Sequence, residues 1–387
     1  MGHKPVTKKL DEGFRVRRLR LGELDGKTIA SWESLEKRAM ESNAYLSPRF
    51  VIPAMRYLGD PKEVRETMFL FVERTDGRTA DLVGAGVFVR SPGTWRFPLP
   101  HLKAYRSPHS YLSGLLVDRD EAEEVIRAFF RYFCSKSSLW HSVEFEHQPS
   151  DGPQAELMAA ISQEFGVTWQ EHAKNYRATL IPADGGEGYV QTHFSSRHLK
   201  DLRRMRRRLE ERGEVRWKGL FGAEADDRSV ERFLDLEHMG WKGEKGTSLR
   251  SRPSHDAFFR EMADRFREDG RLFFTELSLD GVVIASTSNL ISGNVGFAFK
   301  ISWHPDYAKM APGLLNEVDF IRNAPTVCGS LSYIDSGAEE GSFIEQLWSG
   351  RRPLASGVFG ITPLGRRVLS GVGRLRRVKQ WFQIPRS

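Results

Sequence analysis

Apolar residues gather in three consecutive segments of the second half of the chain. RLFFTELSL (271–279) and VVIASTSNL (282–290) are joined by Asp280-Gly281, and VGFAFKISW (295–303) follows Ser292-Gly293-Asn294. An Asp-Gly pair between apolar runs favours a type I′ turn, which needs positive φ at both central residues. The pattern predicts a three-stranded antiparallel meander.

A helix is predicted shortly after the third strand. Pro312-Gly313 opens a segment with apolar residues at helical spacing, namely Leu314, Leu315, Val318, Phe320 and Ile321. Proline pre-sets φ for a first helical turn, and glycine lets a ligand approach the backbone closely. Unpaired N–H groups and the positive end of the helix dipole then make an anion site.

The remaining periodicity predicts an α/β protein with two similar halves. Predicted helices cover 31–39, 48–58, 121–133, 154–165, 198–212, 229–239, 255–269 and 343–348. A hairpin around Asp76-Gly77 is predicted from the runs 68–77 and 80–89, and further strands cover 142–147, 167–182, 331–335 and 358–361. Both halves contain a strand, an Asp-Gly turn and a strand rich in small residues, which indicates an internal duplication. The Gly-rich run 184–188 is the expected linker.

Length and composition fit a two-domain globular protein. The chain has 387 residues, 40% of them hydrophobic, and only two cysteines, Cys134 and Cys328. A disulfide framework and a cysteine-based zinc module are therefore excluded, and no histidine spacing indicates a metal site. No apolar N-terminal segment or stretch of 18 apolar residues occurs, so we expect a cytoplasmic location.

Basic residues are concentrated in two segments. Residues 197–208 hold seven Lys or Arg and one acid, and residues 366–379 hold six Lys or Arg and no acid. The first segment is either a solvated helix face or a contact for an anionic acceptor, a cofactor phosphate or RNA. The second begins a basic amphipathic pattern, Arg366–Phe382, which either packs on the second lobe or lies on the inner membrane face.

The second half resembles the GNAT-like acetyltransferases of the CelD/BcsL (cellulose-biosynthesis-associated) type, two-lobed relatives of the FemAB aminoacyltransferases. The resemblance covers about 192–348 and includes FLDLEHMGWKGEKG and YIDSGAEEGSFIEQLW. Its most specific motif comprises Trp303, Pro305, Tyr307, Ala308, Pro312, Gly313 and Leu315. The resemblance implies tandem GNAT-like lobes, each a mixed, mainly antiparallel sheet flanked by helices, with acyl-CoA as donor and an amine or hydroxyl acceptor.

The family commonly carries a Tyr-Lys pair before a tryptophan that follows the acidic strand. This chain has Ser342-Phe343-Ile344-Glu345 before Trp348 instead. We assign residues 1–185 to an acceptor-selecting lobe without its own CoA site, 186–363 to a catalytic lobe, and 364–387 to the basic tail. The N-terminal lobe is expected to lack a CoA site because no Pro-Gly helix start follows its hairpin.

The predicted acetyl-CoA site combines the third strand with the helix start. The strand would pair with the pantetheine amides, and the N–H groups with Lys309 would bind the diphosphate. The candidate residues are Phe299, Ile301, Trp303, Lys309, Met310, Ala311, Gly313, Leu314 and Leu315.

Three residues are candidates for proton transfer and three for acceptor binding. Glu237 and His238 end a helix that should lie over the meander, where a carboxylate or imidazole could accept a proton. Asp335 ends a strand beside glycine, where open α/β sheets place ligands, although it could equally cap the following short helix. Trp241, Lys242 and Tyr307 are the acceptor-binding candidates. Helix-surface roles for Glu237 and His238, and helix capping by Ser342, are the alternatives.

These patterns together predict transfer of an acyl group, acetyl in the first instance, from CoA to a small-molecule or glycan acceptor. Aminoacyl transfer from charged tRNA is the alternative that the FemAB connection implies. A non-catalytic scaffold with a decayed acyltransferase lobe is a third possibility, favoured by the missing Tyr-Lys pair.

Overall fold

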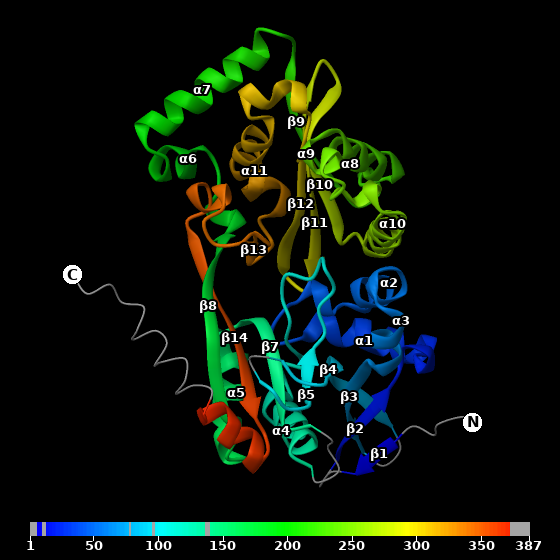
Figure 1. Ribbon diagram of the computed structural model, residues 1–387. Coiled ribbons are helices and arrows are strands. Elements are labelled where there is room, and N and C mark those ends of the chain that lie inside the picture. The colour runs from blue at the N-terminus through cyan, green and yellow to red at the C-terminus, as the bar shows by residue number, and fades with distance from the viewer. Residues whose placement is uncertain (1–5, 10–12, 77–78, 95–96, 136–139, 372–387) are drawn as a thin grey trace, which may run out of the picture. The chain divides into compact units, whose positions relative to one another are not determined.

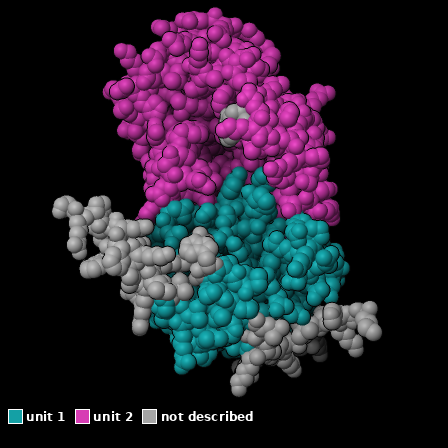
Figure 2. Space-filling view, viewed as in Figure 1, with its two compact units in different colours: residues 1–48, 59–175, 353–387 teal, residues 49–58, 176–352 magenta. Residues whose placement is uncertain are grey.

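The computed structural model describes residues 6–9, 13–76, 79–94, 97–135 and 140–371 (Figure 1). The chain forms two compact units, coloured separately in Figure 2. Unit 1 comprises residues 1–48, 59–175 and 353–387, and unit 2 comprises residues 49–58 and 176–352. The division predicted from the sequence treats the lobes as consecutive, whereas these units interleave, because β8 and β14 each run from one into the other.

Unit 1 is built on a sheet in the order β1-β2-β3-β4-β5-β7-β14. Neighbouring strands in this sheet are antiparallel, except that β5 and β7 are parallel. Strand β6 pairs with β4. The strands are β1 (Val6–Lys9), β2 (Phe14–Leu19), β3 (Met68–Thr75), β4 (Ala80–Ser91), β5 (His101–Ala104), β6 (Leu116–Val117), β7 (Ser142–Pro149) and β14 (Gly350–Gly360).

The helices of unit 1 cover an aromatic core. Phe129, Phe133 and Phe145 are among its fully buried residues. The helical segments are η1 (Leu21–Glu23), α1 (Gly26–Arg38), η2 (Ala44–Leu46), α3 (Pro61–Glu66), α4 (Ala122–Phe133), α5 (Gly152–Glu164) and a helix over 363–371. In the last of these, Leu369 is buried against Phe97 and Val358, so the start of the basic tail packs on unit 1. The rest of that tail lies outside the described residues.

Unit 2 has the strand order β8-β13-β12-β11-β10-β9. The predicted meander is present as β10, β11 and β12, and Asp280 (φ 49°) and Gly281 (φ 79°) both have the positive φ of the predicted turn. The strands are β8 (Thr168–Leu180), β9 (Val215–Phe221), β10 (Leu272–Leu279), β11 (Val282–Ser292), β12 (Val295–Trp303) and β13 (Tyr333–Asp335).

Helices cover both faces of the unit 2 sheet. Thr275 and Thr287 contact α11, whereas Glu276, which points to the opposite face, pairs with Arg232 of α8. The helical segments are α2 (Pro48–Leu58), η3 (Pro182–Asp184), α6 (Glu187–His193), α7 (Ser196–Glu210), η4 (Gly222–Glu224), α8 (Asp227–Met239), α9 (Trp241–Glu244), η5 (Leu249–Ser251), α10 (Pro253–Glu268), η6 (Pro305–Met310), α11 (Pro312–Cys328) and η7 (Phe343–Gln346).

The predicted fold class is confirmed, since each unit is a mixed, mainly antiparallel sheet flanked by helices. In both units a meander is followed by a helix and then by a strand parallel to the meander, namely β7 in unit 1 and β13 in unit 2.

Two segments have places that the sequence did not indicate. Helix α2 belongs to unit 2, where the Phe50 ring packs against the Phe258 ring with 5.4 Å between the ring centroids, and Arg49 forms an ion pair with Glu268. The Gly-rich run expected as a linker packs against α11, because Gly186 donates to the Ile321 carbonyl and a Cβ at Gly185 would lie 2.6 Å from it.

Candidate active site

Strands β12 and β13 of unit 2 pair only at one end. Val295, Gly296 and Phe297 align with Tyr333, Ile334 and Asp335, after which β12 continues to Trp303 paired with β11 alone. The edge of β12 from residue 298 to 303 therefore has no strand partner among the described residues. Figure 2 shows unit 2 hollowed on the face where the two strands separate in Figure 1.

The free edge of β12 exposes particular backbone groups. His304 N–H donates to the Ile284 carbonyl of β11, so the backbone groups of His304, Ser302 and Lys300 face β11. Because these directions alternate along an antiparallel strand, the N–H and C=O groups of Ile301 and Trp303 face the opening. Two residues predicted to bind pantetheine thus do have backbone groups on a free edge.

A bulge in β12 changes where its side chains point. Ser288 pairs with Lys300 and Asn289 with Ala298, which leaves Phe299 as an extra residue. A bulge of this kind kinks the strand and re-aims a side chain. Phe299 packs beside Phe50 and Phe259, with ring centroids 6.1 Å away in each case, so it is a core residue here.

Helix α11 begins beside the free edge. Pro312 has no N–H, and the Leu315 N–H already donates to the Ala311 carbonyl, so Gly313 and Leu314 carry the first available N–H groups. A Cβ at Gly313 would lie 3.1 Å from Trp303 Cδ1 and 3.4 Å from Ile301 Cδ1. Glycine thus allows α11 to pack closely on β12, and Ala311, at φ 47°, turns the chain into the helix.

The other predicted residues of this turn differ in exposure. Lys309 is exposed, Leu314 is half-buried, and Met310 and Leu315 are buried core residues. Tyr307 is half-buried, with its ring centroid 5.3 Å from that of His304. Lys309 therefore presents its charge to solvent just before the helix start.

Glu237 and Lys242 form an ion pair at the free edge. Lys242 Nζ donates to Glu237 Oε1 at 3.1 Å and to the Ile301 carbonyl at 3.3 Å. The other carboxylate oxygen, Glu237 Oε2, accepts from Leu249 N at 2.8 Å. Glu237 is only 2% exposed, so its charge is satisfied by these partners inside the protein.

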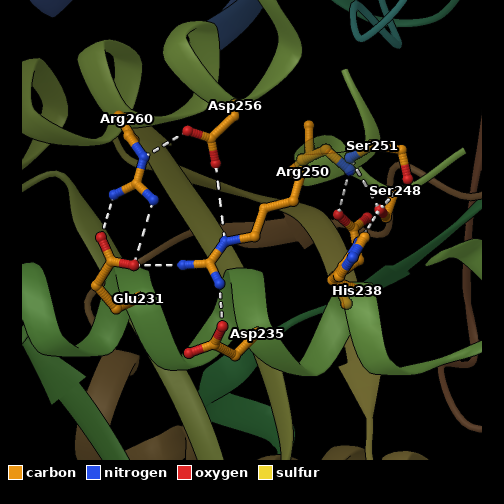
Figure 3. Close-up of polar contacts among 10 residues, drawn as sticks. Glu231, Asp235, His238, Ser248, Arg250, Ser251, Asp256 and Arg260 are labelled. Atoms are coloured by element: carbon orange, nitrogen blue, oxygen red, sulfur yellow. Dashed lines mark hydrogen bonds and ion pairs between the residues drawn. The ribbon is translucent and has the colours of Figure 1, made fainter. Parts of the chain in front are cut away.

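A polar network fastens the segment that carries Lys242 (Figure 3). Arg250 of η5 pairs with Glu231 and Asp235 of α8, and Arg260 of α10 pairs with Glu231 and, at 2.7 Å, with Asp256. His238 Nδ1 lies 3.0 Å from Ser248 Oγ, which also contacts Ser251. His238 thus anchors η5 from an exposed helix position. Trp241 lies in α9, and its side chain is outside the described part of the structure.

Two ionisable residues near Glu237 were missed by the sequence analysis. Lys300 of β12 and His255 of α10 interact electrostatically with Glu237 and with each other. Burial lowers the pKa of Lys300, which the Glu237 carboxylate opposes. Burial also lowers the pKa of His255, with smaller effects of Arg252 and Lys300 in the same direction. A lone lysine inside the apolar segment VGFAFKISW was the available signal.

Asp335 lies where β12 and β13 separate, at the last residue of β13 that pairs with β12. Its Oδ1 accepts from Gly337 N at 2.8 Å and lies 3.5 Å from Arg177 Nη1, and both side chains are buried. Asp335 therefore stabilises the turn after β13, and the alternative that it caps the following helix is wrong. No hydrogen bond or ion pair among the described residues joins it to Glu237.

The expectation that Ser342 caps a helix is also wrong. Ser342 is the N-cap residue of η7, but its side chain accepts no hydrogen bond from that helix. Its Oγ is buried and has no partner within the part of the chain that the structure describes.

The buried face of α11 carries a second polar group. Thr287 Oγ1 donates to Glu317 Oε1 at 2.7 Å, and Asn316 Nδ2 donates to Thr287 Oγ1 at 3.2 Å and Thr275 Oγ1 at 3.1 Å. Burial raises the pKa of Glu317 to about 7, although the bond from Thr287 opposes this. The network fixes α11 on β10 and β11.

The basic segment predicted at 197–208 forms most of α7. Arg206 pairs with Asp319 of α11, and Arg204 with Asp201 at 2.9 Å, while Leu199, Leu202 and Leu209 are buried. Arg197, Lys200, Arg203 and Arg208 are exposed and form no ion pair with any described residue. Helix α7 also packs against η6, the segment that contains Lys309.

Two features that the described residues lack are relevant to the site. No group of three or more His, Cys, Asp or Glu side chains there could hold a metal ion. Among the same residues, no helix is long and apolar enough to cross a membrane.

Comparison with known proteins identifies the family that unit 2 resembles. Residues 196–352 match the Acetyltransferase (GNAT) domain family. The crystal structure of FemX superposes with a TM-score of 0.54 at 11% identity, covering 86% of this chain and 95% of FemX, a likeness of fold. No curated protein matches the sequence.

Two weaker structural matches have TM-scores below 0.5. One is the C-terminal domain of a putative lysylphosphatidylglycerol synthetase from Agrobacterium fabrum, with a TM-score of 0.49 at 8% identity, covering 90% of this chain and 96% of that one. The other is a tandem GNAT protein from the clavulanic acid biosynthesis pathway, with a TM-score of 0.41 at 14% identity. That match covers 90% of this chain and 99% of the other one.

Proposed function

We propose that unit 2 transfers an acyl group, acetyl in the first instance, from acyl-CoA to an amine or hydroxyl acceptor. The separation of β12 from β13 beside the start of α11 is the observation that carries this proposal. It provides a free strand edge and a helix N-terminus next to each other, in a region that matches the GNAT domain family.

The donor would use both features. The pantetheine amides would pair with the backbone of Ile301 and Trp303, and the diphosphate would accept from the N–H groups of Gly313 and Leu314, with Lys309 adding charge. The Lys242 ammonium donates a hydrogen bond to the Ile301 carbonyl. Acyl-CoA that paired with this carbonyl would therefore displace Lys242, or the pantetheine would pair with the strand only from Trp303 onward. Orientation of the two substrates would supply most of the rate enhancement, and backbone N–H groups would stabilise the thioester oxyanion.

Unit 1 would select the acceptor and would not bind CoA. Ser113 Oγ donates to the Glu146 carbonyl at 2.6 Å and accepts from Glu146 N at 3.1 Å, so a side chain already occupies this part of β7. Helix α4, which follows the meander of unit 1, has Glu123 and Glu124 in its first turn. These carboxylates would repel a diphosphate.

The acceptor would be a saccharide or cell-envelope precursor if the resemblance to the CelD/BcsL type extends to substrate. Such a role would suit a cytoplasmic protein whose basic segment 366–382 touches the inner membrane face. The described part of that segment, 366–371, packs on unit 1, and the remainder lies outside the described residues.

Isothermal titration calorimetry with acetyl-CoA tests the proposal. The wild-type chain should bind with micromolar affinity, and Gly313→Asp should lose binding, because the new side chain meets Trp303 and places a carboxylate at the phosphate position. Gly188→Asp is the matched control, since nothing lies within 4 Å of a Cβ at that helical glycine. Equal affinities for the two variants would refute this donor site.

Aminoacyl transfer from tRNA is the second candidate, favoured by the exposed cations of α7. The aromatic residues that flank α7 in sequence are Phe194, which is buried, and Trp217, whereas single-stranded RNA sites usually combine cations with several stacking rings. Salt-sensitive binding of total tRNA without binding of acetyl-CoA would favour this alternative. Binding of neither would favour a non-catalytic scaffold.

A further inference from the structure

Lys300 occupies an unusual position for a lysine. It lies on β12 immediately after the bulged Phe299, beside the free edge where the proposed donor would bind. Residues 299 and 300 both face α8 and α10, because the extra residue interrupts the alternation: Phe299 packs on Phe259 of α10, and Lys300 interacts with Glu237 of α8.

The Lys300 amine has neighbours but no partner of its own. Its Nζ lies 5.6 Å from the centroid of the Phe299 ring, and it forms no hydrogen bond or ion pair with any described residue. The nearest carboxylate, Glu237, is already satisfied by Lys242 at 3.1 Å and by Leu249 N at 2.8 Å. A half-buried ammonium without a dedicated counter-ion is costly, so this position makes loss of the proton easier than it is for an exposed lysine.

The charged groups near Lys300 act on its amine in both directions. His255 at the start of α10 and Lys300 each disfavour a positive charge on the other, whereas the Glu237 carboxylate of α8, which is paired with Lys242, favours the ammonium. On β11 the facing residue is Ser288, whose Oγ donates to the Lys300 carbonyl at 3.3 Å. Burial lowers the pKa of Lys300 more strongly than Glu237 raises it.

We propose that the Lys300 amine is the general base of the acyl transfer, and this inference rests on the proposed function. The acceptor nitrogen or oxygen attacks the thioester carbonyl carbon, and its proton passes to Lys300 Nζ as the new C–N or C–O bond forms. The C–S bond then breaks, and the thiolate of CoA takes a proton back from the Lys300 ammonium or from water. Because Glu237 is paired with Lys242, Lys300 has no ion-pair partner of its own among the described residues.

The test begins with the full-length protein and needs no known acceptor. Competitive labelling with isotopic acetic anhydride across about pH 6 to 11, quantified by mass spectrometry, gives the titration of each lysine. Lys300 should deprotonate at lower pH than the exposed Lys309, and saturating CoA should protect it from labelling. A titration like that of Lys309, or no protection while calorimetry shows CoA bound, would overturn the assignment.

Two variants distinguish a general base from an anion-binding residue and from a packing residue. Acetyl-CoA and a panel of primary amines and sugars are assayed by thiol release, with Lys300→Arg and Lys300→Met compared. Loss of about 10²-fold or more in kcat for both variants, with unchanged affinity for acetyl-CoA, supports the base. Activity retained by Arg would identify an anion-binding residue, and activity retained by Met a packing residue. Absence of acetyl-CoA binding to the wild type is a separate result, which refutes the proposed function itself.

Discussion

Lys242 donates to the backbone carbonyl of Ile301 at 3.3 Å and so links the α8–α9 corner to the free edge of β12. The same ammonium neutralises Glu237 at 3.1 Å. One side chain therefore serves both a buried carboxylate and a backbone acceptor at the proposed donor site. A change at either residue should alter the local charge as well as the packing.

Lys242→Met should destabilise the protein by about 3 kcal/mol, because Glu237 would remain buried with only one hydrogen-bond donor. The double variant Glu237→Gln with Lys242→Met should recover a large part of that loss, since the carboxylate no longer needs a counter-ion. Urea unfolding of the single and double variants measures the coupling. Additive effects would show that the two side chains do not interact in solution.

Ala311→Gly should raise stability by up to about 1 kcal/mol. Ala311 has φ 47°, a left-handed conformation that costs an L-residue about 1–2 kcal/mol and glycine much less. Ala308→Gly, in η6, is the matched control and should be destabilising, because Ala308 has no positive φ to relieve. Thermal unfolding of both variants checks the prediction, and a lower midpoint for Ala311→Gly contradicts it.

Ser113→Ala should destabilise unit 1 by about 2 kcal/mol. The Ser113 hydroxyl serves both Glu146 N–H and C=O, and its removal leaves two backbone groups of β7 without that partner. Ser135→Ala, at a half-buried position just after α4, provides a milder comparison. Amide hydrogen exchange at Glu146 reports the effect directly. Unchanged protection there would mean that water replaces the hydroxyl without loss.

The fold could be predicted largely because its apolar patterns are local. The meander of β10, β11 and β12 has strongly apolar strands and an Asp-Gly turn, so its elements were found with nearly correct bounds. Strand β9 was missed because VRWKGLF is short, contains two charged residues and a glycine, and is mostly half-buried or exposed, so that only pairing with β10 makes it a strand. Helix α2 was found but assigned to the wrong half, since Phe50 meets its partners about 200 residues away.

The candidate site was predictable only in part, for a different reason. Pro312-Gly313 is a local signal, but Lys300 and His255 become neighbours of Glu237 only through the packing of α8 and α10 on β12. The bulge at Phe299, which determines where Lys300 points, has no signature in the run FAFKIS. Ser342 was expected to cap a helix, and Asp335 either to act in proton transfer at a strand end or to cap a helix, yet the hydrogen bonds that would make them caps are formed elsewhere or not at all.

Glu317→Gln should stabilise the protein at alkaline pH and have little effect in acid. Burial raises the pKa of Glu317 from the model-compound value of 4.5 to about 7, so the folded protein binds a proton there that the unfolded chain has lost. The stability that this proton provides is complete below about pH 4.5 and is lost as the pH rises through about 7. The full cost of ionisation is at most about 3 kcal/mol.

Glutamine removes this cost and keeps an oxygen that can accept from Thr287 Oγ1, 2.7 Å from the present carboxylate oxygen. Urea midpoints of Glu317→Gln and the wild type should therefore coincide near pH 5 and separate near pH 8, with the variant more stable. Glu339→Gln, an exposed position on the loop after β13, should show no such pH-dependent difference. A constant offset at both pH values would indicate altered packing of α11, because only a titrating carboxylate makes the difference depend on pH.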